Sequence, residues 1–175
     1  MQQAFTVFED LPVPTVAAVR GVALGAGCQL AIACHLRVGA PDAQFGLLEA
    51  RWGLIPDLGA TWRLPRLVGL SRATDLTVTG RCIDAGTALA WGLLDAVLDE
   101  PDFDAAVHRY AASLAAGPTV ATGQVPALLR DSLSRSRDDV LAAERRAQAA
   151  CLASADFAEA ATAAVEGRSP RFQGR

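Results

Sequence analysis

Apolar residues recur along this chain with helical spacing in some stretches and as short continuous runs in others. The opening residues place apolar side chains at i, i+3, i+4 and i+7, namely Ala4, Val7, Phe8 and Leu11. This spacing predicts an amphipathic helix at the start, and a chain that begins inside such a helix is expected to lack an earlier segment. The next apolar run, Val16 to Val19, has no polar alternation and predicts a strand buried on both faces.

Further short strands are predicted between Val19 and residue 100. Leu36 to Ala40 reads as a second strand, because Gly39 and the Pro41-Asp42 turn bound an apolar run. Phe45 to Trp52 predicts a compact turn or short helix, and Leu94 to Leu98 again has strand character.

Two helices are predicted between these strands. Ser71 is expected to cap a helix that runs to Thr79 and closes at Gly80. Asp84 is expected to cap another that runs to Trp91 and closes at Gly92. The alternation of short strands with helices is typical of an α/β fold.

The pattern becomes purely helical from Pro101 onward. One apolar stripe is formed by Phe103, Ala106, Val107, Tyr110, Ala111 and Leu114. Helices are then predicted from Gly117-Pro118 to about Leu133, from Asp138 to Leu152 and from Asp156 to Val165. The expected organisation is therefore a mixed α/β part over residues 1–100 and a helical region over residues 101–175.

A glycine-rich turn, Gly25-Ala26-Gly27, interrupts the first part. Its small residues allow a ligand to approach the backbone closely. A helix is predicted to follow from Cys28 to Cys34, with apolar residues available to face a core at Leu30, Ala31 and Ala33. The first free N–H groups of such a helix point toward any anion that develops beside the turn.

Composition narrows the function classes. The chain has 175 residues, of which 51% are hydrophobic and 20% charged, as in a packed globular protein. Its net charge of -3 argues against nucleic acid as a partner. All 16 basic residues are arginines, which excludes a lysine Schiff base and a Walker-type phosphate loop. The sequence has no apparent signal peptide or membrane-spanning run, and its tryptophans are expected in the core.

The cysteines and histidines do not form a metal-binding pattern. The four cysteines, Cys28, Cys34, Cys82 and Cys151, lack CxxC spacing and are accompanied by only two histidines. We therefore expect free thiols, a reducing cytoplasm and no bound metal.

Several segments together resemble one known family, the enoyl-CoA hydratase/isomerase (crotonase) family. They are PTVAAVRGVALGAG, APDAQFGLLEARWGLIP, TWRLPRLVG with the following helix, TGRCIDAGTALAWGLLDAV and the tail ending SPRFQGR. The resemblance implies a crotonase-like (ClpP/crotonase) spiral core of short strands and helices with a C-terminal helical region. It also implies that the N-terminal portion of the family fold is absent.

Members of this family have an oxyanion hole, which is a pair of backbone N–H groups that stabilise a thioester enolate. The resemblance implies that this chain contains one of the two groups. One donor maps onto the N–H of Ala26, with Gly25 and Gly27 beside it, whereas the other belongs to the absent portion. The two glutamates of the family's hydratases map onto positions 29 and 49. Position 49 is Glu49, but position 29 is Gln29, which lines the predicted substrate pocket and holds water without exchanging protons.

Asp57 is the second acid that the resemblance selects. The phrase GLIPDLGATWRLPRLVG is similar to the isomerase branch that includes ring-1,2-epoxyphenylacetyl-CoA isomerases, in which an aspartate at this place works as the base. We expect neighbouring apolar residues to desolvate its carboxylate, namely Leu54, Ile55, Leu58 and Trp62. The alternative role for Asp57 is that of a helix cap before Gly59.

Two functions remain open. The first is isomerisation of an enoyl-CoA, with Asp57 as the main base, Glu49 as a second acid/base or pocket-shaping group, and coenzyme A as part of the substrate rather than a cofactor. The second is a catalytically silent acyl-CoA binder, or a truncated subunit that associates with a full-length relative, which Gln29 favours. The resemblance implies a homo-oligomer, a trimer or hexamer, without nucleic acid or membrane partners.

Overall fold

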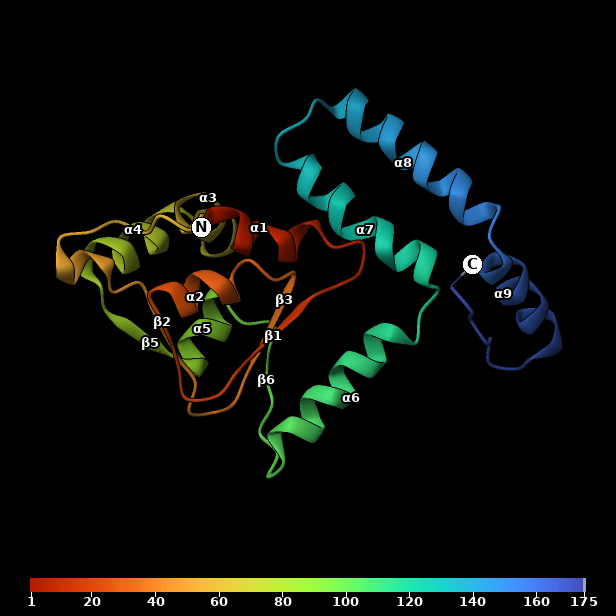
Figure 1. Ribbon diagram of the computed structural model, residues 1–175. Coiled ribbons are helices and arrows are strands. Elements are labelled where there is room, and N and C mark those ends of the chain that lie inside the picture. The colour runs from red at the N-terminus through yellow and green to blue at the C-terminus, as the bar shows by residue number, and fades with distance from the viewer. Residues whose placement is uncertain (175) are drawn as a thin grey trace. The chain divides into compact units, whose positions relative to one another are not determined.

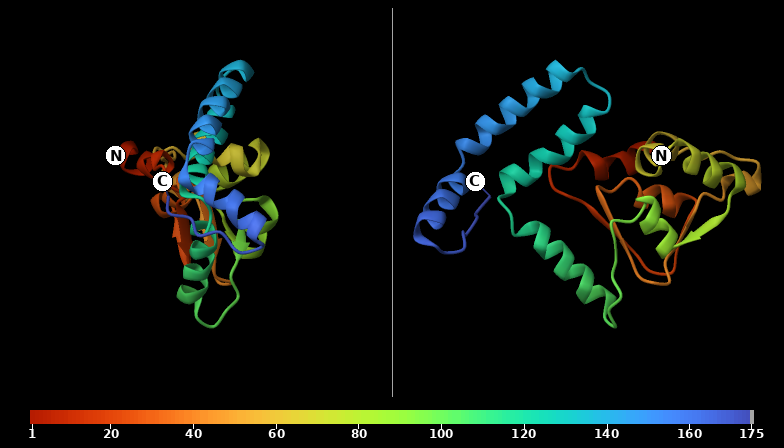
Figure 2. Two further views of the ribbon diagram at one scale, coloured as in Figure 1. Left: turned by 90° about the vertical axis from the view of Figure 1, so that its right-hand side faces the viewer. Right: turned by 180° about the vertical axis from the view of Figure 1, so that it is seen from behind.

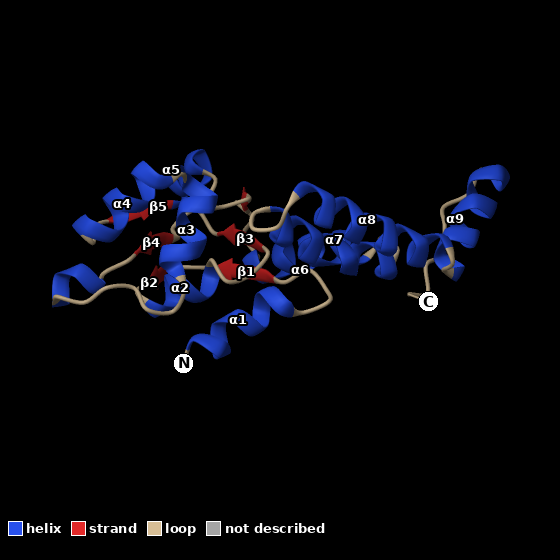
Figure 3. Ribbon diagram, turned by 90° about the horizontal axis from the view of Figure 1, so that it is seen from above, coloured by secondary structure: helices blue, strands red, loops and turns tan. Residues whose placement is uncertain are grey.

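The computed structural model describes residues 1–174 and divides the chain into two compact units. The first comprises Met1–Leu11 and Thr15–Arg109, and the second comprises Pro12–Pro14 and the residues from Tyr110 onward. The change of unit therefore falls inside a helix near residue 109, whereas the sequence pattern changes near residue 100. All the strands that the structure describes lie before residue 98, and helices and loops follow (Figure 3).

The first unit contains two three-stranded sheets (Figure 1). The first sheet is parallel, and its order is β1 (Val16–Val19), β3 (Leu36–Gly39) and β6 (Ala96–Val97). In the second, β2 (Val22–Leu24) pairs parallel with β4 (Gln44–Gly46), which pairs antiparallel with β5 (Cys82–Asp84). The predicted α/β alternation is confirmed.

The predicted strands are confirmed, with one correction to their burial. β1 and β3 fall on the expected ranges, and β6 is a two-residue core of the expected strand. The prediction that Val16 to Val19 is buried on both faces is wrong, because Ala18 is exposed. β1 lies at the edge of its sheet, and the face of the sheet from which the Ala18 side chain projects is not covered there.

Six helices accompany the sheets of the first unit. They are α1 (Gln2–Asp10), α2 (Ala26–Ala31), the 3₁₀ helix η1 (Glu49–Trp52), α3 (Ala60–Val68), α4 (Leu70–Thr79) and α5 (Ala85–Trp91). The Asp84 cap of α5 is confirmed, because the carboxylate accepts a hydrogen bond from the backbone N–H of Thr87 at 2.7 Å. The Ser71 cap is wrong, because Gly69 precedes α4 and makes no side-chain capping bond.

The core of the first unit lies between the sheets and these helices. Its largest fully buried apolar side chains are Phe45, Leu47, Leu64, Leu93 and Leu94. The expected core position of Leu30 is wrong, since this side chain is 40% exposed while Ala31 and Ala33 are buried. The core position expected for Trp52 and Trp62 is also wrong, because they are 79% and 40% exposed.

The second unit is helical. α6 (Phe103–Ala115) leads into it, and α7 (Thr119–Ser132), α8 (Arg137–Leu152) and α9 (Ala155–Glu166) follow. α7 and α8 run side by side as an antiparallel pair (Figure 2). The helices predicted in this region are confirmed to within a few residues. Among the described residues, no helix combines the length and apolarity needed to cross a membrane.

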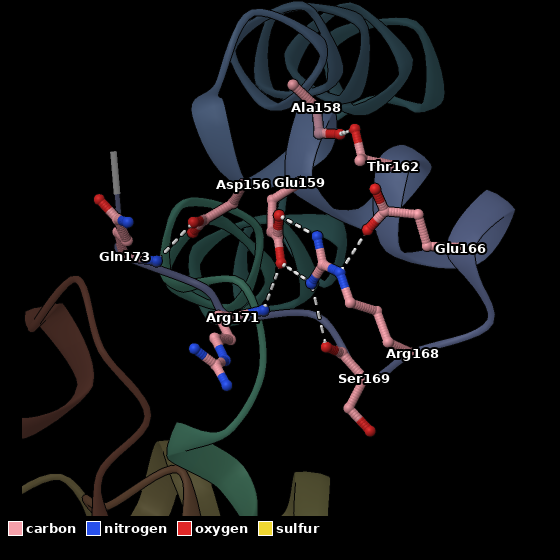
Figure 4. Close-up of polar contacts among 9 residues, drawn as sticks. All are labelled: Asp156, Ala158, Glu159, Thr162, Glu166, Arg168, Ser169, Arg171 and Gln173. Carbon is pink, nitrogen blue, oxygen red and sulfur yellow. Dashed lines mark hydrogen bonds and ion pairs between the residues drawn. The ribbon is translucent and has the colours of Figure 1, made fainter.

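The chain that follows α9 folds back onto this helix (Figure 4). The guanidinium group of Arg168 contacts the carboxylates of Glu159 and Glu166. The backbone N–H of Arg171 donates to Glu159, and the N–H groups of Gln173 and Gly174 donate to the buried carboxylate of Asp156. The tail up to Gly174 is thus held along α9 by hydrogen bonds while most of its residues stay exposed.

Candidate active site

The glycine-rich turn begins α2 and places Ala26 at its exposed first position. Gly25 has φ 52° and ψ -118°, and its N–H donates to the carbonyl oxygen of Gly46 at 2.9 Å, which fixes the turn against β4. α2 covers Ala26–Ala31, so it begins and ends earlier than the predicted Cys28 to Cys34. Because the first N–H groups of a helix have no intrahelical acceptor, the Ala26 N–H is available to a ligand.

Gln29 is the most buried polar residue of this region, with 0% of its surface exposed. Its Nε2 donates to Oε1 of Glu49 at 2.7 Å. Its Oε1 accepts from the backbone N–H of Leu58 at 2.9 Å and, at 3.4 Å, from that of Ala60. Three of the four hydrogen-bonding positions of this amide are therefore occupied by the protein itself.

Glu49 begins η1 and directs its carboxylate toward the glycine-rich turn. A Cβ atom added at Gly25 would lie 3.6 Å from Oε1 of Glu49, so the acid and the turn are close neighbours. Oε1 is occupied by Gln29, whereas Oε2 is buried and has no hydrogen-bond partner among the described residues. A buried carboxylate oxygen without a donor is rare in folded proteins.

Asp57 lies in the turn between η1 and α3, next to the backbone that Gln29 holds. Its carbonyl oxygen accepts from the side chain of Gln2 at 2.8 Å, and the residue is exposed. The expected desolvation is wrong, because Leu54 and Ile55 are 63% and 74% exposed. The alternative capping role is also wrong, because Gly59 begins α3 with φ 98° and no side-chain capping bond.

Arg63 also fixes the turn that carries Asp57, through the carbonyl oxygen of Leu58. Its guanidinium group makes two hydrogen bonds of 2.8 Å to Glu9 and one of 2.9 Å to the carbonyl oxygen of Leu58. A Cβ atom at Gly59 would collide with this guanidinium group, so the turn requires glycine there. From sequence alone, Arg63 and Arg66 are candidates either for contact with CoA phosphates or for a solvated loop. Arg63 fits neither, because it is 6% exposed and committed to this ion pair.

The side chains of His35 and the cysteines, which could in principle carry chemistry, are held in contacts within the protein or are free thiols. His35 Nδ1 lies 2.9 Å from the hydroxyl of Thr15. Burial raises the pKa of the Cys28 thiol to about 12 and also raises the pKa of Cys34, and all four cysteines are free. In the described part of the chain, no group of three or more histidines, cysteines and acids is placed to hold a metal ion.

The structure thus brings together the predicted site residues that lie around Gln29. Gly25, Gln29 and Glu49 are linked by direct contacts, and the turn that carries Asp57 is tied to the same amide. Sequence reasoning misses the role of Arg63 and its partner Glu9, which are 54 positions apart and follow no recognisable motif.

Comparison with known proteins gives consistent matches. The family described as enoyl-CoA hydratase/isomerase matches residues 1–175. The chain is 36% identical to 1,2-epoxyphenylacetyl-CoA isomerase of Escherichia coli (strain K12), over 94% of this chain and 63% of that protein. It is 38% identical to the mitochondrial methylglutaconyl-CoA hydratase of Mus musculus, over 94% of this chain and 54% of that protein.

A solved structure agrees with these sequence matches. The crystal structure of an enoyl-CoA hydratase from Bacillus anthracis superposes with a TM-score of 0.95 at 32% identity, covering 99% of this chain and 67% of that one. The chain spans between one half and two thirds of the length of the two curated relatives.

Proposed function

The chain belongs to the enoyl-CoA hydratase/isomerase family, whose crotonase fold it shares, and we propose that it moves the double bond of an enoyl-CoA thioester. This is one of two chemistries found among its relatives, since one is named an isomerase and another a hydratase. The proposal selects isomerisation because position 29, next to Glu49, holds an amide instead of a second acid.

The reaction requires one proton to change place. A carboxylate removes a proton from the carbon next to the thioester carbonyl of a 3-enoyl-CoA, and the electron pair moves onto the thioester oxygen as an extended enolate. The same proton, or one from water, is then delivered to the γ carbon. The double bond shifts from the 3,4 to the 2,3 position, and the composition of the thioester does not change.

The proposed roles follow from chemistry and position. Asp57 is the base, because it is an exposed carboxylate that a substrate can reach without displacing protein groups. Glu49 is the second acid/base or pocket-shaping group, and its Oε2, which has no donor among the described residues, is the proposed contact point. The Ala26 N–H stabilises the enolate oxygen, and one such donor is worth about 2.7–4 kcal/mol in a transition state.

One observation supports this proposal: a single buried amide contacts the carboxylate of Glu49 and the backbone next to Asp57, and it borders the proposed oxyanion turn. Gln29 donates to Glu49 and accepts from Leu58, the neighbour of Asp57. Gly25, whose carbonyl oxygen accepts from the Gln29 backbone N–H, precedes Ala26 directly. Gly25, Glu49 and Leu58, which are far apart in the sequence, thereby all contact Gln29.

The test is to incubate the purified chain with a 3-enoyl-CoA and, separately, with a 2-enoyl-CoA. Double-bond migration changes the absorbance of the conjugated thioester and leaves its mass unchanged, which is the expected result with the 3-enoyl substrate. Addition of water to the 2-enoyl substrate would show a hydratase instead. No turnover by a folded chain that binds acyl-CoA would favour the silent acyl-CoA binder, for which the glutamine at position 29 is the supporting observation.

A further inference from the structure

The orientation of the Gln29 side chain is determined by its backbone neighbours. Leu58 and Ala60 each present an N–H group to one end of this amide, and an N–H can only donate. The end that faces them must therefore be the carbonyl oxygen Oε1. The opposite end, which faces Glu49, must be the NH₂ group of Nε2.

This orientation determines which oxygen of Glu49 is occupied. Nε2 donates to Oε1 of Glu49 at 2.7 Å, and the second carboxylate oxygen, Oε2, is left buried without a donor among the described residues. Since Gln29 is 0% exposed and held at both ends, the carboxylate cannot turn freely and offer either oxygen. Oε2 is the carboxylate oxygen of Glu49 that no donor among the described residues occupies.

We propose that Gln29 is a positioning residue that holds Glu49 with Oε2 directed to the substrate and, through Leu58 and Ala60, sets the turn that carries Asp57. This inference rests on the function proposed above. This role differs from holding a water molecule, because the Gln29 amide makes its hydrogen bonds to protein groups. Gln29 touches neither the substrate nor the reacting atoms in this role.

The substitution Gln29→Glu tests the two contacts of the amide separately. The introduced carboxylate still accepts from Leu58 and Ala60, so the turn keeps its acceptor. Toward Glu49, however, a donor is replaced by a second negative charge, which repels the carboxylate. Gln3→Glu, which makes the same change at an exposed position of α1, is the matched control.

The kinetic expectation concerns double-bond migration, and water addition is followed in the same assay because Gln29→Glu also rebuilds the glutamate pair of the family's hydratases. At pH 8 we expect Gln29→Glu to lower kcat for double-bond migration by about 10²-fold with KM little changed, because a small misplacement of a catalytic group has an effect of this size. As pH falls, the introduced carboxyl group becomes protonated and donates to Glu49 again. The ratio of variant kcat to parent kcat should therefore rise with falling pH, while Gln3→Glu gives a ratio near one throughout. A Gln29→Glu ratio near one at every pH would overturn the inference.

A measurement on the free protein tests the same contact without turnover. The side-chain NH₂ resonances of Gln29 in a ¹⁵N-labelled sample should shift with pH through one ionisation, and Glu49→Gln should abolish this titration. If the resonances are independent of pH, or titrate equally in Glu49→Gln, Gln29 does not hold Glu49 and the inference fails even when the parent chain is active. If the titration is present but the parent turns nothing over, the proposed function fails while the placement of Glu49 by Gln29 stands.

Discussion

Arg63 shows at the scale of single residues how the candidate site is kept rigid. One guanidinium group joins Glu9 of α1, the carbonyl oxygen of Leu58 and the glycine turn that begins α3. Its side chain is 6% exposed and that of Glu9 is 16% exposed, so water screens this ion pair little. The loss of one partner would leave a nearly buried charge without compensation.

We therefore expect Glu9→Ala to lower the free energy of unfolding by about 3 kcal/mol, since removal of one member of a buried pair has effects of this order. The measurement is urea denaturation of the chain and the variant. Glu100→Ala is the matched control, because it removes a pair with Arg109 that is about half exposed. The control should change stability by less than about 1 kcal/mol. Equal losses in the two variants would contradict the account.

Cys28 provides a prediction about chemical reactivity. Because burial raises its pKa to about 12, the thiol is protonated in the folded protein at pH 8, and thiolates are the reactive form. Iodoacetamide labelling followed by peptide mass spectrometry should modify Cys151, which is half-buried, well before Cys28. Denaturation should remove this difference. Labelling of the two cysteines at the same rate in the native chain would contradict the burial of Cys28.

The same raised pKa links stability to pH, and the direction follows from its sign. The folded state disfavours the thiolate of Cys28, so the contribution of this thiol is fully present below the ordinary cysteine pKa of 9.0 and is lost as pH rises from there toward about 12. Cys28→Ala should reduce the part of the alkaline destabilisation that this thiol causes. Urea denaturation of the chain and the variant at a series of alkaline pH values measures the difference.

The residues of the candidate site were predictable from motifs, but their contacts were not. Glu49 and Asp57 could be nominated because the sequence around them matches a family. The use of both ends of the Gln29 amide depends on a backbone turn at Leu58 and Ala60, 29 and 31 positions away. A local pattern does not encode such a contact. The exposure of the apolar residues before Asp57 likewise depends on which surfaces the fold covers.

At the scale of elements, α9 and the tail behind it form one hydrogen-bonded unit (Figure 4). Glu159 accepts from Arg168 and from the backbone N–H of Arg171. The hydrogen bond from Arg168 is the main cause that lowers the pKa of Glu159 to about 2, and the Arg171 N–H adds to it. Asp156 holds the last described residues through two further N–H groups.

This arrangement predicts that the tail is released in acid. A lowered folded-state pKa means that the contribution of Glu159 is fully present above the ordinary glutamate pKa of 4.5 and is lost as pH falls toward about 2. The backbone N–H resonance of Arg171 should shift over that window in an NMR titration. Glu159→Gln should remove most of the shift. A resonance that already moves between about pH 7 and 5, above the ordinary range of a carboxyl group, would contradict the account.

Predictions about helices and strands were right where local interactions determine how an element begins or ends. Asp84 caps α5 because an acidic side chain can reach the Thr87 N–H three residues ahead. Ser71 fails as a cap because Gly69 takes the N-cap position and α4 begins two residues earlier, directly after α3. The exposure of Ala18 depends on which part of the sheet face is covered by other elements, which the run of apolar residues does not contain.

At the scale of the whole chain, the resemblance predicted the α/β crotonase fold, and the superposition over 99% of the chain confirms it. Periodicity alone gave only the alternation of strands and helices, because the division into two sheets depends on pairings such as that of β4 with β5. The assembly stays a prediction. We expect a homo-oligomer, a trimer or hexamer, and sedimentation velocity measures it directly. A strict monomer that still binds acyl-CoA would contradict this expectation.

The measurement that tests the central claim most directly compares the folded chain with Asp57→Asn on a 3-enoyl-CoA. Asparagine has nearly the same size as aspartate, but it cannot take up a proton near neutral pH. The account predicts that the unaltered chain moves the double bond without adding water and that Asp57→Asn lowers kcat by about 10²–10⁴-fold, the contribution of a positioned base. Circular dichroism should show the same fold for both. Equal rates in the two proteins, or no migration by the folded parent, would contradict it.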